Sequence, residues 1–189
     1  CYPVIMYVSE SGSDYTGDGT QVNPYRNINH ALSLAVNGDT ICVLPGHYDE
    51  FIHISNLDLV ITSEYIFTSD FSSVENTILN GAPEDAVIHM WDCPNIQIIG
   101  FSIENGVHAI KCENSSPLIR NNILLNTHGD GVQAVGGSSP TITNNLIFNT
   151  AQSGIIFEAS DGVFINNTVV NCGTNPPDEN PISAIECRD

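Results

Sequence analysis

Two stretches of this 189-residue chain share one pattern: "SSPLIRNNILLNT" at residues 115–127 and "SSPTITNNLIFNT" at residues 138–150. Each stretch has Ser-Ser-Pro, a short apolar step, an Asn-Asn pair, an apolar run and Asn-Thr. The pair occurs a third time, and its first members Asn121, Asn144 and Asn166 are 23 and 22 residues apart. Self-similarity at a nearly fixed period indicates a repeat architecture.

The segments between these asparagines have the composition of short β-strands. Runs such as "VQAV", "TIT" and "GIIF" are interrupted every few residues by Asn, Gly, Ser or Pro, which is typical of strands joined by tight turns. A period of this length is too short for repeats of two helices. We therefore predict an all-β solenoid with rungs of about 22–23 residues, whose strands stack about 4.8 Å apart.

The repeated asparagines are predicted to lie at the corners of the coil. Asparagine tolerates the left-handed backbone of sharp corners, and its amide both donates and accepts hydrogen bonds. Amides at equivalent corners can form a ladder along the coil, as they do in cross-β structures. The predicted ladder residues are Asn105, Asn121, Asn122, Asn126, Asn144, Asn145, Asn149, Asn166, Asn167 and Asn171. In the earliest unit Gly100 replaces the first asparagine. The alternative interpretation is an exposed polar row that binds sugar.

Before the repeats comes "YVSESGSDYTGDGTQVNPYRNINHALSLAVNGDTICVLPGHYDE". This opening and the repeats together resemble the right-handed parallel β-helix proteins of the pectin-lyase-like superfamily, over nearly the whole chain. The resemblance implies a cap at residues 1–40, made of a strand, a Gly/Asp loop and a helix near residues 27–36. Residues 41–189 would then form the β-helix, with a side loop near residues 64–75 and an open C-terminal end.

The charge balance restricts the partners of the chain. It has 22 acidic residues and four basic ones, which argues against nucleic-acid binding because that requires a basic patch. It also argues against unaided binding of a polyanion such as pectate or alginate, although calcium would offset the repulsion. No apolar run approaches 18 residues, so no membrane span is predicted.

The cysteine count is even, the spacing is wide and no Cys-x-x-Cys is present, which favours disulfides in an exported protein over a zinc site. The candidates are Cys1, Cys42, Cys93, Cys112, Cys172 and Cys187. Cys172 with Cys187 is the favoured pair, because the two flank the loop "GTNPPDENP". Cys93 with Cys112 and Cys1 with Cys42 are further candidate pairs. Buried free thiols, and a lipid on Cys1, remain alternatives.

Candidate metal ligands and catalytic groups are few. Asp14 and Asp18 in "SDYTGDGT" are a weak calcium candidate, with a structural turn as the alternative. In enzymes of the superfamily, catalysis is usually on an outer face built from neighbouring rungs. Aligning "GVHAI", "GVQAV", "GIIF" and "PISAI" gives the outward column His108, Gln133, Ile156 and Ser183. That column contains no carboxylate, Lys or Arg, so we predict no catalytic residue. Two or more carboxylates beside Lys111 or Arg120 would reverse this.

The predicted function is therefore a non-catalytic β-helix module, located outside the cell or on its surface. It would be a fibre-forming subunit or a glycan-binding adhesin that stacks end-to-end through its open C-terminal rung. The alternative is a carbohydrate-active enzyme, a calcium-assisted polysaccharide lyase or an epimerase.

Overall fold

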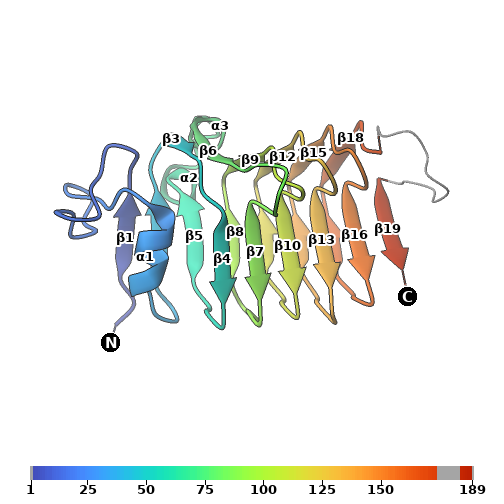
Figure 1. Cartoon of the computed structure of the whole chain (residues 1–189), viewed down its shortest axis with the longest axis horizontal. Helices are drawn as coiled ribbons and strands as arrows, with labels where there is room; N and C mark the ends of the chain where they lie inside the picture. Colours follow the sequence, from blue (N-terminus) through green and yellow to red (C-terminus); the bar gives the residue numbers. More distant parts are fainter. Residues whose placement is uncertain (1, 174–183, 189) are drawn as a thin grey trace.

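The computed structural model describes residues 2–173 and 184–188 as a coil of short strands that form three parallel sheets (Figure 1). In spatial order, sheet A contains β1 (Ile5–Val8), β2 (Thr40–Val43), β5 (Val60–Ser63), β8 (Gln97–Ile99), β11 (Leu118–Arg120), β14 (Thr141–Thr143) and β17 (Val163–Ile165). Sheet B contains β3 (Gly46–Tyr48), β6 (Thr77–Asn80), β9 (Ser102–Glu104), β12 (Ile123–Leu125), β15 (Leu146–Phe148) and β18 (Thr168–Val170). Sheet C contains β4 (Ile52–Ser55), β7 (Ile88–Trp91), β10 (Ile110–Glu113), β13 (Val132–Val135), β16 (Ile155–Glu158) and β19 (Ile185–Arg188).

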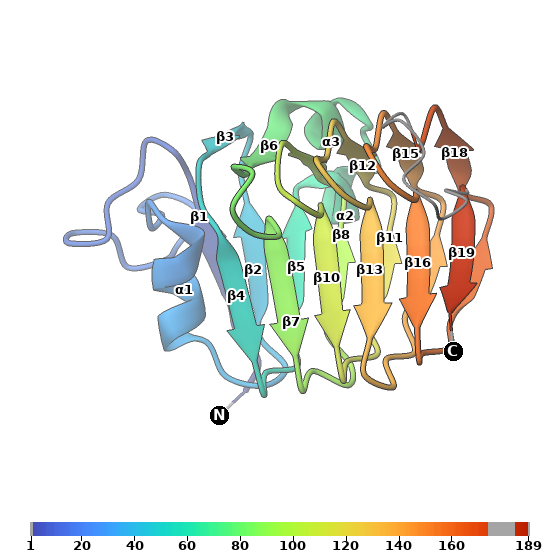
Figure 2. The same cartoon turned by 45° about the vertical axis from the view of Figure 1, so that its right-hand side comes forward.

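One rung of the coil takes one strand from each sheet, and each strand pairs in parallel with its equivalent in the next rung (Figure 2). In sheet A, for example, Ile98, Ile119 and Ile142 occupy equivalent positions and are fully buried. Because β-branched side chains fill the interior in aligned columns, the core is continuous along the coil. The structure confirms the predicted all-β parallel β-helix.

At the corner between sheets A and B, the two members of each Asn-Asn pair have different roles. The first members Asn121, Asn144 and Asn166 have left-handed φ angles of 57°, 55° and 56°. These angles make the sharp corner, which most other side chains would resist. The second members form the buried ladder described next.

The side chains of Asn122, Asn145 and Asn167 stack along the coil as a hydrogen-bonded ladder. The Asn145 Oδ1 accepts from the Asn122 backbone N–H at 2.9 Å and from its Nδ2 at 3.1 Å, and the Asn167 Oδ1 serves Asn145 in the same way at 3.0 Å each. The Nδ2 groups also donate to carbonyls of the neighbouring rung, such as that of Ile119 at 3.0 Å. Asn122 and Asn145 are only 1% and 2% exposed, so this ladder satisfies corner backbone inside the protein.

The remaining predicted asparagines lie where sheet B ends, on the surface. Asn126, Asn149 and Asn171 also have left-handed backbone. Their amides bond from rung to rung, with Asn171 Nδ2 donating to Asn149 Oδ1 at 2.6 Å and Asn149 Nδ2 to Asn126 Oδ1 at 3.3 Å. Asn105 Nδ2 similarly donates to Asn80 Oδ1 at 2.7 Å. These exposed amides are therefore already partnered by one another.

The third corner, between sheets C and A, has a ladder that the sequence analysis did not anticipate. The Ser115 Oγ accepts from the Cys93 backbone N–H, the Ser138 Oγ from that of Ser115, and the Ser160 Oγ from that of Ser138, each at 3.1 Å. Ser115 and Ser138 are the first serines of the repeated Ser-Ser-Pro. The whole repeated pattern therefore marks corners.

The excursion after β5 is helical and packs against sheets A and B. It contains α2 (Tyr65–Thr68) and α3 (Ser72–Asn76). Gly100 lies beneath it with φ of 80°, and a Cβ there would come within 2.8 Å of Ser63 Oγ and 2.9 Å of Tyr65 Cβ. Glycine replaces asparagine in this unit because α2 occupies the space of a side chain.

The N-terminal part contains β1, a loop and α1 (Ile28–Leu34), which covers one end of the coil. Ile28 and Ala31 are buried, and Leu32 and Ala35 pack against the core. At the other end, β17 and β18 expose Val163, Phe164, Ile165 and Val170. Residues 174–183, on which part of the predicted open end falls, lie outside the described residues.

The five described cysteines are free thiols, so the two predicted pairs among them are not formed. Cys112 lies on the inward side of β10 between Met90 and Ala134. Cys93 lies at the following corner, where its thiol faces the carbonyls of Ile54 and Trp91. The two thiols therefore lie at different places in a rung, Cys112 within a strand and Cys93 at a corner. Cys1 lies outside the described residues, so its pairing with Cys42 stays a prediction.

Candidate functional site

The outward face of sheet C carries charged groups that the sequence alignment misplaced. Lys111 on β10 lies opposite Gln133, which in turn lies opposite Ile156. His108 precedes β10, and Glu186 on β19 lies opposite Ile156. The outward row is therefore His53, His89, Lys111, Gln133, Ile156 and Glu186.

The predicted column of His108, Gln133, Ile156 and Ser183 is thus wrong at His108, and Ser183 lies outside the described residues. The cause is the loop before β10, whose sequence resembles that of strand β13 and the residue before it. "GVHAI" matches "GVQAV", but the backbone N–H groups of His128 and Gly129 donate to the carbonyls of Gly106 and Val107, which aligns Gly106 and Val107 with the segment before β13 and leaves Ile110 opposite Val132. The strand starts three residues later than the alignment assumed, and the argument that the face is uncharged fails.

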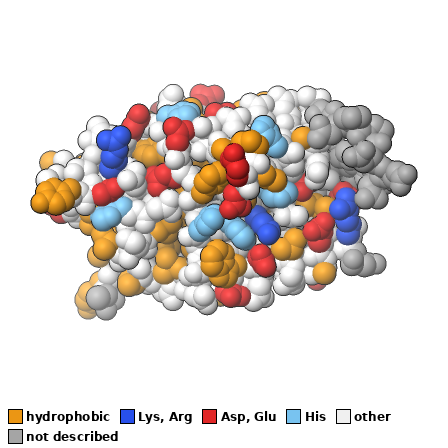
Figure 3. Space-filling model, in the orientation of Figure 1, with side chains coloured by type: hydrophobic (Ala, Val, Ile, Leu, Met, Phe, Trp, Pro, Cys, Tyr) orange, Lys and Arg blue, Asp and Glu red, His pale blue; other side chains and the backbone are white. Residues whose placement is uncertain are grey.

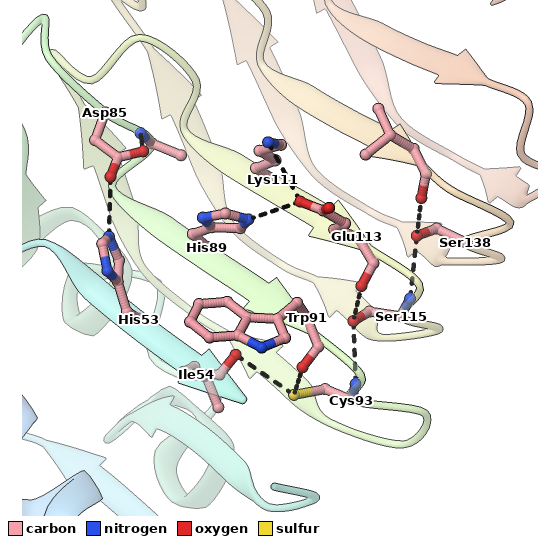
Figure 4. A network of polar contacts seen from close by, with 12 residues as sticks. His53, Ile54, Asp85, His89, Trp91, Cys93, Lys111, Glu113, Ser115 and Ser138 are labelled. Atoms are coloured by element: carbon pink, nitrogen blue, oxygen red, sulfur yellow. Dashed lines mark hydrogen bonds and ion pairs between the residues drawn. The ribbon is translucent and has the colours of Figure 1, made fainter. Parts of the chain in front are cut away.

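Four side chains on β7 and β10 form the centre of this face (Figure 4). The Glu113 carboxylate lies 3.4 Å from His89 Nε2 and 3.4 Å from Lys111 Nζ through the same oxygen. Trp91, which follows His89 on the same side of β7, meets the His89 ring edge-to-face with centroids 5.4 Å apart. Figure 3 shows hydrophobic, histidine, basic and acidic side chains gathered over the middle of this face. We call His89, Trp91, Lys111 and Glu113 the central cluster.

A histidine–aspartate pair adjoins the central cluster. His53 on β4 lies at the position equivalent to His89, and the centroids of the two rings are 5.8 Å apart. Its Nε2 is 3.0 Å from Asp85 Oδ2, which is contributed by the loop between β6 and β7. The face therefore brings together three rungs and one loop.

The face holds two cations among four carboxylates. Arg188 on β19 pairs with Glu186 at 2.7 Å and Glu158 at 3.3 Å, as Lys111 pairs with Glu113. With Asp85 added, and with the histidines neutral, acidic groups exceed basic ones. Arg120 lies on β11 of sheet A and does not contribute.

The pKa of His89 lies below its usual value. Burial of the ring, whose side chain is 18% exposed, is the main cause. The Lys111 charge acts in the same direction, while the Glu113 hydrogen bond opposes both. Since the neutral imidazole is favoured, His89 can accept as well as donate a hydrogen bond near pH 7.

The two predicted calcium ligands serve separate turns. Asp14 Oδ1 accepts from the backbone N–H groups of Arg26 and Asn27 at 2.8 and 3.0 Å. Asp18 Oδ1 accepts from Thr20 N–H and Oγ1 at 3.0 and 2.7 Å. Burial acts to raise the pKa of Asp14, but these backbone bonds lower it overall. Their geometry matches the alternative of structural turns, and a calcium role stays a prediction.

Comparison with known proteins identifies the class. Residues 37–184 match the family described as right handed beta helix region, so the chain belongs to the right-handed parallel β-helix family. The fold is also similar to that of the crystal structure of pectate lyase Pel9A, with a TM-score of 0.56 and 12% identity. This chain is 96% covered and spans 57% of the length of that one. At that identity, the likeness shows the fold alone.

No curated protein sequence matches the chain. Within the described part of the chain, no helix is long and apolar enough to cross a membrane.

Sequence reasoning missed His53, Asp85, His89 and Trp91 as members of one site. A signal for the histidines was present, because "FIHI" and "VIHM" both place a histidine between two apolar residues. In a strand, that alternation directs the histidine outward. For Asp85 no comparable signal exists, because its position depends on the path of a loop.

Proposed function

We propose that this chain is an extracellular carbohydrate-binding β-helix module that holds a glycan along the outer face of sheet C. The observation that carries the proposal is the exposure of Trp91, at 37%, beside the polar groups of the central cluster. Aromatic rings at exposed sites offer a flat apolar surface, and sugar rings have apolar C–H faces that stack on such surfaces. Charged and amide groups on neighbouring rungs can then bind the hydroxyls.

The charges of the face favour a neutral glycan. Asp85, Glu113, Glu158 and Glu186 outnumber Lys111 and Arg188, within a chain of net charge −18. A uronate polymer would be repelled unless a cation intervened. Gln133 lies next to Lys111 in the row, where its Nε2 donates to Glu158 at 3.4 Å and its amide oxygen can accept from hydroxyls.

The test compares two aromatic substitutions. Binding of soluble neutral polysaccharides is measured by calorimetry for the wild type, Trp91→Ala and Tyr15→Ala. Tyr15 is 96% exposed in the N-terminal loop, which makes it a matched control. We expect Trp91→Ala to weaken binding at least tenfold and Tyr15→Ala to leave it unchanged. Equal affinities in the three proteins, or no binding by the wild type, would reject the proposal.

A polysaccharide lyase or epimerase is the second candidate. It is favoured by the contact of one Glu113 oxygen with both His89 and Lys111, with Asp85 nearby, since acid–base chemistry requires charged groups within a few ångströms. The fold is similar to that of a pectate lyase, which suggests cleavage of a polysaccharide as the reaction to test. Uronate polymers are incubated with the protein, with and without calcium, and unsaturated products are followed by ultraviolet absorbance. Product that forms with the wild type and not with Glu113→Gln would favour the enzyme.

End-to-end association is proposed separately, with a second copy of the chain as partner. It is supported by the exposed apolar side chains of β17 and β18, among them Phe164 and Val170. Within the described residues these are the last strands of sheets A and B, and exposed strand edges favour association. Light scattering of the wild type and Phe164→Asp measures particle mass. A wild type that is larger than the variant supports association, and a monomeric wild type rejects it.

A further inference from the structure

We propose that His53, Asp85 and His89 form a binding site for a divalent transition metal, with zinc as the best-fitting ion. Each residue offers one ligand atom, and the three atoms lie within 4.8 Å of one another. In the described part of the chain, these residues are the one such group of three. We call them the histidine–aspartate triad.

The ligand types select the metal. Two imidazoles and one carboxylate suit zinc and its neighbours in the first transition row, whereas calcium takes oxygen ligands. Ligand atoms in a tetrahedral zinc site are roughly 3.4 Å apart, because each lies about 2.1 Å from the metal. The 3.0 Å separation of His53 Nε2 and Asp85 Oδ2 is already close to that spacing, and only His89 has to approach.

The scaffold holds the triad in place before any ion binds. His53 and His89 lie on paired strands at equivalent positions, so their Cα atoms are fixed one rung apart. Asp85 is held through its backbone, because its carbonyl accepts from the Val107 N–H at 2.8 Å. Its Oδ1 accepts from the Ala86 N–H at 2.7 Å, which leaves Oδ2 directed at His53.

Glu113 supplies the second layer of contacts. Its carboxylate contacts His89 Nε2 at 3.4 Å, and in Figure 4 the His89 ring lies between Glu113 and the His53–Asp85 pair. The other ring nitrogen of His89, Nδ1, is therefore the one that faces His53 and Asp85. A carboxylate on the outer nitrogen of a metal-binding histidine orients the ring and increases its basicity.

The charges around the triad favour a cation. Asp85 and Glu113 carry two negative charges, and Lys111, which is 3.4 Å from the same Glu113 oxygen as His89, carries one positive charge. Among the described residues, two other histidine–carboxylate pairs lack a third ligand: His47 with Asp49 at 3.4 Å and His108 with Asp130 at 3.3 Å. Three ligands leave one tetrahedral position open for water or a hydroxyl.

The experiment titrates zinc chloride into the metal-free chain by calorimetry. The wild type is compared with His53→Ala, His89→Ala and the control His47→Ala, which removes an equally exposed histidine from the other pair. We expect one zinc per chain in the wild type and in His47→Ala, and at least tenfold weaker binding in the two triad variants. Because His53 is half-exposed, His53→Ala keeps the test valid if His89→Ala does not fold.

Two results would overturn the proposal. One is the absence of binding by the wild type, and the other is an equal affinity in His53→Ala, which would assign the zinc to another group such as the free thiols of Cys172 and Cys187. Glu113→Gln tests the orienting carboxylate, and we expect affinity to fall about 10–100-fold. The readout is independent of glycan binding, so either proposal can fail without the other.

Discussion

Two columns of equivalent positions run along this coil, and they differ in what the chain places there. At the corner between sheets A and B, Asn122, Asn145 and Asn167 repeat one residue type, and every amide is hydrogen-bonded to a neighbouring rung. On the outer face of sheet C, the row changes from histidine to lysine, glutamine, isoleucine and glutamate. In the first column Asn122 and Asn145 are buried, whereas the second column is partly exposed to solvent at every position except the buried Ile156.

The difference separates stability from function. A repeated amide uses its hydrogen-bonding capacity within the protein and has none left for a ligand. A row whose residue type changes from rung to rung cannot form such a ladder of identical side chains. Its charged groups therefore keep hydrogen-bonding capacity for a ligand. In this repeat fold, the constant column therefore carries the architecture, and the variable face carries the candidate site.

The largest expected effect is on the constant column. Asn145→Ala removes four hydrogen bonds and leaves the Asn122 N–H and the Ile119 carbonyl without this partner in the interior. We expect the free energy of unfolding in urea to fall by about 3 kcal/mol. In the control Asn144→Gly, which keeps the left-handed corner, we expect a change of less than about 0.5 kcal/mol. Equal losses in the two variants would contradict a structural ladder.

A smaller effect is expected where the repeat is interrupted by α2. Gly100 and Gly137 both have φ of 80°, but a Cβ at Gly137 would meet nothing within 4 Å. Both alanine variants suffer the same backbone strain, and Gly100→Ala also clashes with Ser63 and Tyr65. Urea unfolding should therefore show Gly100→Ala less stable than Gly137→Ala by about 1–2 kcal/mol. A difference near zero would mean that α2 moves aside freely.

The buried thiols give a pH-dependent effect. Burial, together with the nearby Glu64 charge, raises the pKa of the Cys42 thiol from 9.0 to about 12. Above about pH 9 the unfolded chain loses this proton while the folded chain retains it, so the free energy of unfolding falls by about 1.4 kcal/mol per pH unit. Cys42→Ala should reduce the fall in the free energy of unfolding with pH above about pH 9. Cys187→Ala, at an exposed position, should not change it. The predicted disulfide of Cys1 with Cys42 would leave no thiol to titrate and no difference in slope.

The smallest effect on stability is expected on the variable face. Lys111→Met breaks the partly exposed pair with Glu113, and such pairs contribute at most about 1 kcal/mol. Thermal unfolding should barely change, while affinity for a bound glycan falls. A large loss of stability would instead assign Lys111 to the architecture.

The fold could be predicted from the sequence because its signal is repeated. Asn121, Asn144 and Asn166 each report the same corner, so one misread unit does not change the period. The repeated serines at Ser115 and Ser138 were visible as well, but their backbone bonds were not inferred from the pattern.

The candidate site could not be predicted, because it occurs once. Its residues come from three strands whose relative register depends on the length of the loops between sheets B and C. A slip of three residues replaced Lys111 with His108 and made a charged face look uncharged. The position of Asp85 depends on hydrogen bonds to residues such as Val107, and these are fixed only when the coil is formed.

The most direct test of the functional face uses Trp91, which is the single tryptophan of the chain. Neutral polysaccharides are titrated into the protein while its tryptophan emission is recorded, and the same titration is followed by calorimetry. If the glycan lies on the outer face of sheet C, emission changes saturably with the midpoint that calorimetry gives. A glycan that binds by calorimetry and leaves the emission unchanged would place the site elsewhere and contradict the account.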